Sequence, residues 1–204
     1  MKHLVLSLTA LLFTVSTLYA QSKKELAATL NRDLEMYRRY TLTLNLDSSL
    51  LFMPPKMFEV VHRDSLKESL VQSMNNEFLS IQMTSFDFVS KSKIKIKKAG
   101  QYHWAFIPYK GSMRLTLKGE ERFRTIVIPV LKSQFGSKNV RMENDSTMSI
   151  KLINKEFIAF KDSASPTWAL IEDKRAGEGR EAEYQKMLFE TILPEEILKA
   201  VDKK

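Results

Sequence analysis

The segment Met83-Thr84-Ser85-Phe86-Asp87-Phe88 marks the position in this 204-residue chain where the spacing of apolar residues changes. Before it, leucines recur at helical intervals; from it onward, apolar and polar residues alternate over several segments. A period of ~3.6 residues indicates an amphipathic helix, whereas a period of two indicates a strand. Helices that precede a run of antiparallel strands, followed by a short helical tail, predict an α+β fold rather than an α/β fold.

Three helices are predicted ahead of this segment. The first covers residues 23–40, and residues 41–46 either continue it or form a strand. A short helix capped by Asp47 or Ser48 then ends near Pro54-Pro55, and a third helix runs from its N-cap Asp64 to Phe78. The stripe of the first helix consists of Leu26, Leu30, Leu34 and Tyr37. The stripe of the third consists of Leu66, Leu70, Met74 and Phe78.

The strands predicted after the third helix are separated by turn residues. Residues 123–131 form either a strand that breaks at Pro129 or a short helix. Turns are expected at Lys110-Gly111, at residues 143–146 and at Asn154-Lys155. The predicted strands are 83–88, 93–97, 102–106, 113–117, 140–142, 148–153, 156–160 and 167–171. After the break at Gly177-Glu178-Gly179, two helices cover residues 181–191 and 195–201, with Pro194 at the start of the second.

Residues 1–20 have the pattern of a secretory signal peptide. A positive start is followed by an uncharged apolar stretch that ends at Ala20, and this stretch is short for a membrane span. We therefore expect export, to the periplasm or to the medium, with cleavage after Ala20; an uncleaved N-terminal anchor is the alternative. Residues 21–204 are then expected to form one domain without a transmembrane segment.

The composition excludes several kinds of site and partner. The chain has no cysteine, which excludes disulfides, thiol catalysis, Fe–S clusters and Cys-ligated zinc. The 32 Lys and Arg residues against 24 Asp and Glu residues give a net charge of +8. This surplus serves solubility or favours an acidic surface, such as an anionic glycan or lipid. For an exported protein, nucleic acid is not expected as a partner.

The order of elements resembles the nuclear transport factor 2-like, or cystatin-like, superfamily. The resemblance rests on the stripe of the first helix, the break at Leu46-Asp47-Ser48-Ser49-Leu50, the helix 64–78, the hairpin 148–160 and the strand 166–173. It covers residues 24–173, and the helical tail 174–204 extends beyond it. The leader also resembles those of exported proteins of Bacteroidetes-type bacteria. The resemblance implies a curved sheet wrapped around the first helix as a cone, with a cavity that serves several chemistries or none.

Enzymes of this superfamily place an Asp, His or Tyr inside the apolar cone as a general acid or base. The candidates in this sequence are Asp47, Asp87, His103, Tyr102 and Tyr109. Asp87 alternates with two phenylalanines, and His103 alternates with Tyr102 and Trp104, so neither shares a strand face with its aromatic neighbours. With the aromatic face turned inward, we expect both polar residues to lie outside, and no catalytic residue is assigned.

Four aromatic residues could line a ligand pocket or simply form the core. They are Tyr102, Trp104, Phe106 and Trp168. A second feature is basic: Lys91, Lys93, Lys95 and Lys97 are predicted on one strand face, with Lys98 adjacent. These lysines either dock on an anionic surface or protect an edge strand from aggregation.

No cofactor and no metal site are expected. Only His62 and His103 follow the leader, and neither has a partner at ligand spacing. Glu143-Asn144-Asp145-Ser146 lacks the spaced loop that calcium needs and is interpreted as a hairpin turn.

The sequence favours an exported, non-catalytic binding module for a small apolar ligand in the cone, or for an envelope protein or glycan at its surface. The first alternative is a small hydrolase, isomerase or dehydratase that uses an inward Asp, His or Tyr. The second is a structural or assembly factor of the cell envelope.

Overall fold

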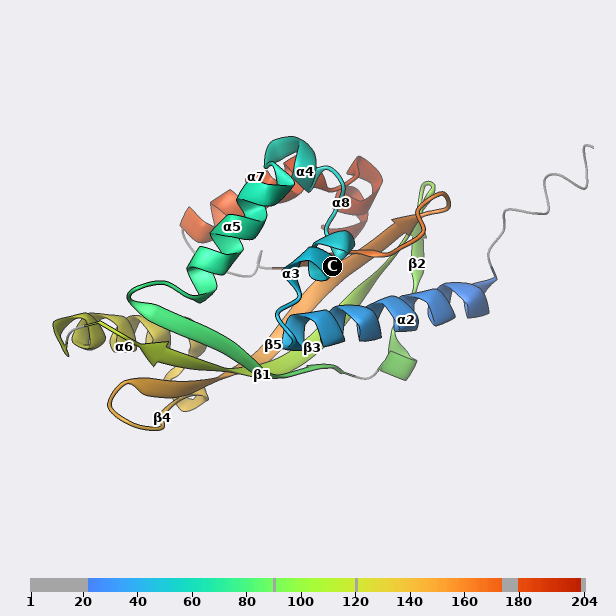
Figure 1. Cartoon of the computed structure of the whole chain (residues 1–204). Helices are drawn as coiled ribbons and strands as arrows, with labels where there is room; N and C mark the ends of the chain where they lie inside the picture. Colours follow the sequence, from blue (N-terminus) through green and yellow to red (C-terminus); the bar gives the residue numbers. More distant parts are fainter. Residues whose placement is uncertain (1–21, 90, 120, 174–179, 203–204) are drawn as a thin grey trace, which may run out of the picture.

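The computed structural model describes residues 22–89, 91–119, 121–173 and 180–202. The expected signal peptide at residues 1–20 and the break at Gly177-Glu178-Gly179 lie outside these ranges. The α+β prediction is confirmed, because the helices α2 to α5 precede the sheet and the helices α7 and α8 follow it (Figure 1). None of the described helices combines the length and the apolar character needed to span a membrane.

A single antiparallel sheet carries the fold. Its central path runs in the order β1-β3-β5-β4, while β2 pairs with β3 and β6 pairs with β5. The strands are β1 (Leu79–Phe88), β2 (Lys97–Ala99), β3 (Tyr102–Leu117), β4 (Val140–Met142), β5 (Thr147–Asp162) and β6 (Ala169–Glu172). The hairpin between β4 and β5 has the predicted turn, in which Asn144 Oδ1 accepts hydrogen bonds from the backbone of Ser146 and Thr147.

The first helix forms where its leucine stripe predicted. The helix α2 (Lys23–Leu42) begins with a capping box between Ser22 and Glu25 and buries Leu26, Leu30 and Leu34. It extends to Leu42, so the strand alternative for residues 41–46 is wrong. The short elements α3 (Leu46–Ser49), η2 (Leu50–Phe52) and α4 (Met57–Val60) follow, and the cap of α3 is Asn45 rather than Asp47 or Ser48.

The third predicted helix is shorter and less buried than its sequence indicated. The helix α5 (Arg63–Met74) begins after His62, without a side-chain cap from Asp64, and none of its residues is fully buried. Phe78, expected in the buried stripe, lies beyond the helix with 49% of its surface exposed. A leucine stripe marks one face of a helix but does not supply the element against which that face must pack.

The two longest strands, β3 and β5, continue through positions where turns were predicted. The turn predicted at Lys110-Gly111 is instead an irregularity within β3, where the register against β5 shifts between Tyr109 and Gly111. The turn predicted at Asn154-Lys155 lies inside β5, where Asn154 has a φ of 53°. Glycine and residues that tolerate positive φ serve bulges as well as turns, so sequence alone does not distinguish the two.

Three apolar clusters hold helices against this sheet. The first lies between α2 and the central strands, and includes Leu34, Ile107, Phe157 and Trp168. The second packs α7 (Arg180–Ile192) and α8 (Glu195–Val201) against Trp104, Ile158 and Phe160. Residues 104 and 107 of β3 have opposite parity, so these helices cover opposite faces of the sheet.

The third cluster includes the segment 123–131, for which the sequence allowed a strand or a helix. This segment belongs to the helix α6 (Glu121–Phe135), with Pro129 inside the helix. Val127, Ile128, Leu131 and Phe135 pack at helical spacing against Leu115, Met148 and their neighbours in the sheet. The strand 93–97 was predicted wrongly, because Lys91–Lys93 form a 3-10 turn (η3) and pairing begins only at β2.

Candidate functional site

A cleft of about 300 Å³ opens where the ends of three strands meet the α7–α8 junction. One wall comes from η2 and the prolines that follow it, and the other from the ends of β3, β5 and β6. Its apolar lining includes Leu51, Met53, Pro55, Phe160, Ala169, Ile192 and Pro194. Its polar lining includes Lys56, Tyr102, Lys161, Asp162, Ser165 and Thr167.

Local sequence fixes both walls of this cleft. Pro54-Pro55 ends η2, and the backbone N–H of Met57 donates to the Pro54 carbonyl in a tight turn. At the end of β5, Asp162 Oδ1 accepts hydrogen bonds from the backbone N–H groups of Ala164 and Ser165, at 2.9 and 2.6 Å. These bonds shape the loop that leads into β6.

The helix α2 holds the same loop from the other face of the sheet. The Asp33 carboxylate is 1% exposed; its Oδ1 accepts from Arg32, and its Oδ2 accepts from the Trp168 backbone N–H at 2.9 Å. The Trp168 indole donates to Thr29 Oγ1 at 3.1 Å. The hydrogen bonds satisfy a buried charge, so the cleft wall from residue 162 to residue 169 is fixed to the first helix.

The charge at the cleft is uneven. Lys56 is exposed at its edge, and its side chain makes no hydrogen bond or ion pair within the described residues. Asp162, the carboxylate in the lining, uses one oxygen to bind the loop backbone. The arrangement suits a small molecule that buries an apolar body and leaves an anionic group near Lys56.

The space between α2 and the central strands is filled by aromatic rings. Tyr109 stacks on Phe157 with a centroid distance of 4.6 Å, and Tyr37 lies edge-on to Phe157 at 5.5 Å. Phe52 and Phe86 contact the same Tyr37 ring. The region expected to be a cone cavity is therefore packed here, and the cleft lies elsewhere.

Two phenols in this packed region are poor acid–base groups near neutral pH. Burial raises the pKa of Tyr37 to about 12, and the neighbouring Glu172 contributes in the same direction. Burial also raises the pKa of Tyr109 well above its usual value, as does its hydrogen bond to Glu172 Oε1 at 2.8 Å. Both hydroxyls stay protonated, so neither serves as a general base.

The other acid–base candidates come from separate elements and lie near cations. Asp47 in α3 accepts from Lys67 at 2.7 Å, and its side chain is 69% exposed. Asp87 lies on the outward face of β1, as predicted, and pairs with Arg38 at 3.0 Å. His103 is half-buried at the start of β3, where burial, Lys98 and Lys161 lower its pKa.

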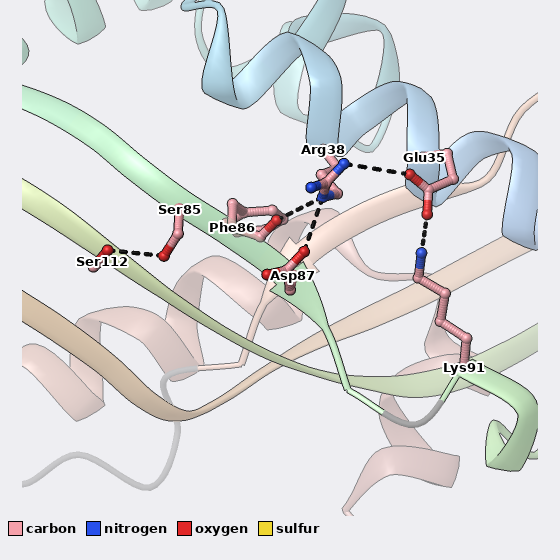
Figure 2. A network of polar contacts seen from close by, with 7 residues as sticks. All are labelled: Glu35, Arg38, Ser85, Phe86, Asp87, Lys91 and Ser112. Atoms are coloured by element: carbon pink, nitrogen blue, oxygen red, sulfur yellow. Dashed lines mark hydrogen bonds and ion pairs between the residues drawn. The ribbon is translucent and has the colours of Figure 1, made fainter.

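Asp87 belongs to a polar network along the free edge of β1, shown in Figure 2. Arg38 of α2 donates from Nε to the Phe86 carbonyl at 2.8 Å and to Asp87. Glu35 bridges Arg38 and Lys91. Because β1 pairs on one side only, Arg38 satisfies an edge carbonyl, which is a structural role.

The orientation predicted for the aromatic ladder is wrong. Tyr102, Trp104 and Phe106 face α7 and α8 rather than α2, while His103 has the parity of the residues that face α2. Helices cover both faces of this sheet, so alternation alone could not assign a face to the first helix. Trp104 and Trp168 are buried core residues, and Phe106 lines a shallow hollow with Pro108. Of the four predicted pocket residues, Tyr102 lines the cleft.

The predicted lysine row is not continuous. Lys91 pairs with Glu35 and lies over the Phe88 ring, and Lys97 lies 4.8 Å above the Trp104 ring. Lys93, Lys95 and Lys98 are exposed. The row was inferred from strand alternation, which the 3-10 turn at Lys91–Lys93 interrupts.

The residues described in the structure hold no group of three or more His, Cys, Asp or Glu side chains at metal-binding proximity. His62 lies 3.9 Å from Asp64, and both are exposed.

Sequence reasoning missed most of the cleft. Its lining comes from five segments that share no motif, and only the paired prolines at 54 and 55 indicated an unusual backbone there. Comparisons with protein-family models, with curated proteins and with solved structures found no match for this chain.

Proposed function

We propose that this protein is an exported, non-catalytic binding module that holds a small amphipathic molecule in the cleft beside Pro55 and Pro194. The observation that carries the proposal is an apolar cleft of about 300 Å³ with an unpaired ammonium, that of Lys56, at its edge among the described residues. Ligand pockets are typically apolar concavities of ~300–1,000 Å³ with few polar groups. The ligand class is an apolar body that carries one acidic group.

Export is part of this proposal and is supported by the apolar leader that ends at Ala20. Membership of the nuclear transport factor 2-like superfamily is likewise proposed, on the order of helices before a curved antiparallel sheet. The enzyme alternative has less support. The buried phenols stay protonated, and Asp47 and Asp87 form ion pairs at the surface.

A pair of fluorescent probes tests the cleft. The anionic 8-anilinonaphthalene-1-sulfonate and the neutral N-phenyl-1-naphthylamine are titrated into the wild-type chain and into Leu51→Glu. Leu51 is 55% exposed at the mouth of the cleft, so this change leaves the core intact. We expect one saturable site for each probe and, because a carboxylate at the mouth disfavours apolar ligands, about tenfold weaker binding in the variant.

The matched control is Val71→Glu, the same charge at a valine that is 47% exposed on α5 and does not line the cleft. It should bind both probes as the wild type does. Lys56→Gln should weaken the anionic probe about twofold to fivefold and leave the neutral probe unchanged. Equal binding by the wild type and Leu51→Glu would show that the probes bind elsewhere and would reject the proposal.

A further inference from the structure

Beyond the cleft, one half of the sheet presents a patch of polar side chains. Three rows cross the strands in register, and together they define the polar face. The first row is Arg141, Ser149, Arg114 and Gln82. The second is Lys151, Ser112 and Ser85, and the third is Thr147, Thr116 and Ser80.

The opposite side of the same strands explains this pattern. Leu115, Met148 and Ile150 alternate with the polar residues and pack against α6. Along β3, residues of the polar face have the parity of Trp104, which α7 and α8 cover in the other half of the sheet. Here the corresponding positions are exposed or half-buried, and the side chains of Gln82, Arg114, Arg141 and Lys151 are exposed.

The polar face carries a surplus of positive charge that the described residues do not neutralise. Arg114 donates to Glu143 at 3.1 Å. The side chains of Arg141, Lys151 and the nearby Lys138 make no hydrogen bond or ion pair within the described chain. These three cations surround a hollow of about 500 Å³ on β4 and β5, together with Asn139, Glu143 and Ser149.

The side chains of this face favour one class of acidic partner over nucleic acids, lipids and proteins. Apart from the exposed Ile153 and Phe78, which flank its rows in the sequence, this face offers no aromatic ring on which nucleic-acid bases could stack and no apolar group to insert among lipids. It also lacks the apolar centre of a protein interface. Guanidinium groups bind carboxylates and sulfates through paired hydrogen bonds, and serine and threonine hydroxyls exchange hydrogen bonds with sugar hydroxyls.

Spacing favours a polymer over a single small anion. Neighbouring strands lie ~4.8 Å apart, so the backbones of Arg141 and Arg114, two strands apart, are separated by about 10 Å. One carboxylate does not bridge such sites, whereas successive acidic groups of an extended chain do. We infer that the polar face binds an acidic polysaccharide, with Arg141 and Lys151 as its principal contacts. This inference does not rest on the function proposed for the cleft.

The test measures binding of the full chain to polygalacturonate at low salt, with neutral dextran as the reference polymer. Arg141→Gln combined with Lys151→Gln should bind polygalacturonate about fivefold to tenfold more weakly, because each exposed ion pair contributes modestly. The charge-matched control combines Lys93→Gln with Lys95→Gln, two exposed lysines outside the polar face. It should stay within about twofold of the wild type, and binding by the wild type should fall as salt rises.

Several outcomes would overturn the inference. If both double variants lost polygalacturonate binding equally, net charge rather than the polar face would control binding. Binding to dextran as strong as to polygalacturonate would remove the role of the acidic groups. Inorganic phosphate that competes as well per charge as the polymer would indicate a site for single anions. Binding confined to phosphatidylglycerol vesicles would assign the face to a lipid headgroup instead.

Discussion

The two halves of the sheet use the same strands differently. In one half, α2 covers one face and α7 with α8 cover the other, so Trp104 and Ile107, on opposite sides of β3, are both buried. In the other half, α6 covers one face, and the alternate residues, such as Arg114 and Ser149, form the polar face. A single strand can therefore belong to a three-layer core at one end and to a solvent-facing surface at the other.

The irregularities at mid-strand lie between these halves. The register of β1 against β3 shifts between Met83 and Ser85, and that of β3 against β5 shifts near Gly111. In β5, the apolar positions change from even to odd numbers across Asn154, as Ile150 and Phe157 illustrate. Each bulge inserts a residue that resets alternation, which keeps apolar side chains on the helix-covered side in both halves.

The largest effect on stability is expected in the half of the sheet that helices cover on both faces. Trp168→Ala removes a fully buried ring and its hydrogen bond to Thr29, and should lower the free energy of unfolding by about 3–5 kcal/mol. Urea denaturation followed by circular dichroism measures this loss. Arg141→Gln on the polar face is the matched comparison and should change stability by less than about 0.5 kcal/mol. Similar losses in the two variants would contradict the division of the sheet.

A pH-dependent effect of intermediate size is expected in the same half. The folded pKa of Tyr37 is about 12 against an ordinary value of 10.0, so the folded state holds this proton more tightly than the unfolded state. The resulting stability is complete below pH 10 and is lost as pH rises toward 12, by on the order of 2 kcal/mol. Tyr37→Phe should remove this part of the alkaline loss, as measured by urea titrations between pH 9 and 12, while the part due to the raised pKa of Tyr109 remains.

The control for this pH series is Tyr184→Phe. The Tyr184 side chain is 58% exposed in α7, so its removal should leave the alkaline loss of stability unchanged. If the wild type and Tyr37→Phe lose the same stability as pH rises, the pKa of Tyr37 is not raised in the folded state.

The smallest effect is expected at the junction between the halves. A Cβ atom added at Gly111 would lie 2.7 Å from the Ser85 carbonyl oxygen, so Gly111→Ala forces the strands apart. Because β1 is an edge strand that can shift outward, we expect a loss of about 1 kcal/mol, at the lower end of the cost of overpacking, measured by thermal unfolding. Lys110→Ala, at the exposed neighbouring position, should stay within about 0.5 kcal/mol of the wild type. An unchanged midpoint for Gly111→Ala would mean that the bulge relaxes without cost.

The sequence predicted the candidate sites less well than it predicted the elements. Asp87 was placed correctly on the outward side of β1, because its phenylalanine neighbours are strongly apolar. The aromatic ladder was expected inside the cone but faces α7 and α8, and the cleft was not foreseen. Its walls come from segments that are distant in the chain, such as Met53 and Phe160, and no local pattern records which segments meet.

By itself, the sequence determined the class of fold, the first helix and the alternation of the strands, because these depend on periodicity and capping within a few residues. The tertiary structure decided the features that depend on contacts between distant segments of the chain. It placed Gly111 inside a strand and a bulge at Asn154, left α5 without a buried face, and covered one half of the sheet on both sides while leaving the other open. A residue type can fit a turn or a bulge, and a core or a surface, until the partner that packs against it is present.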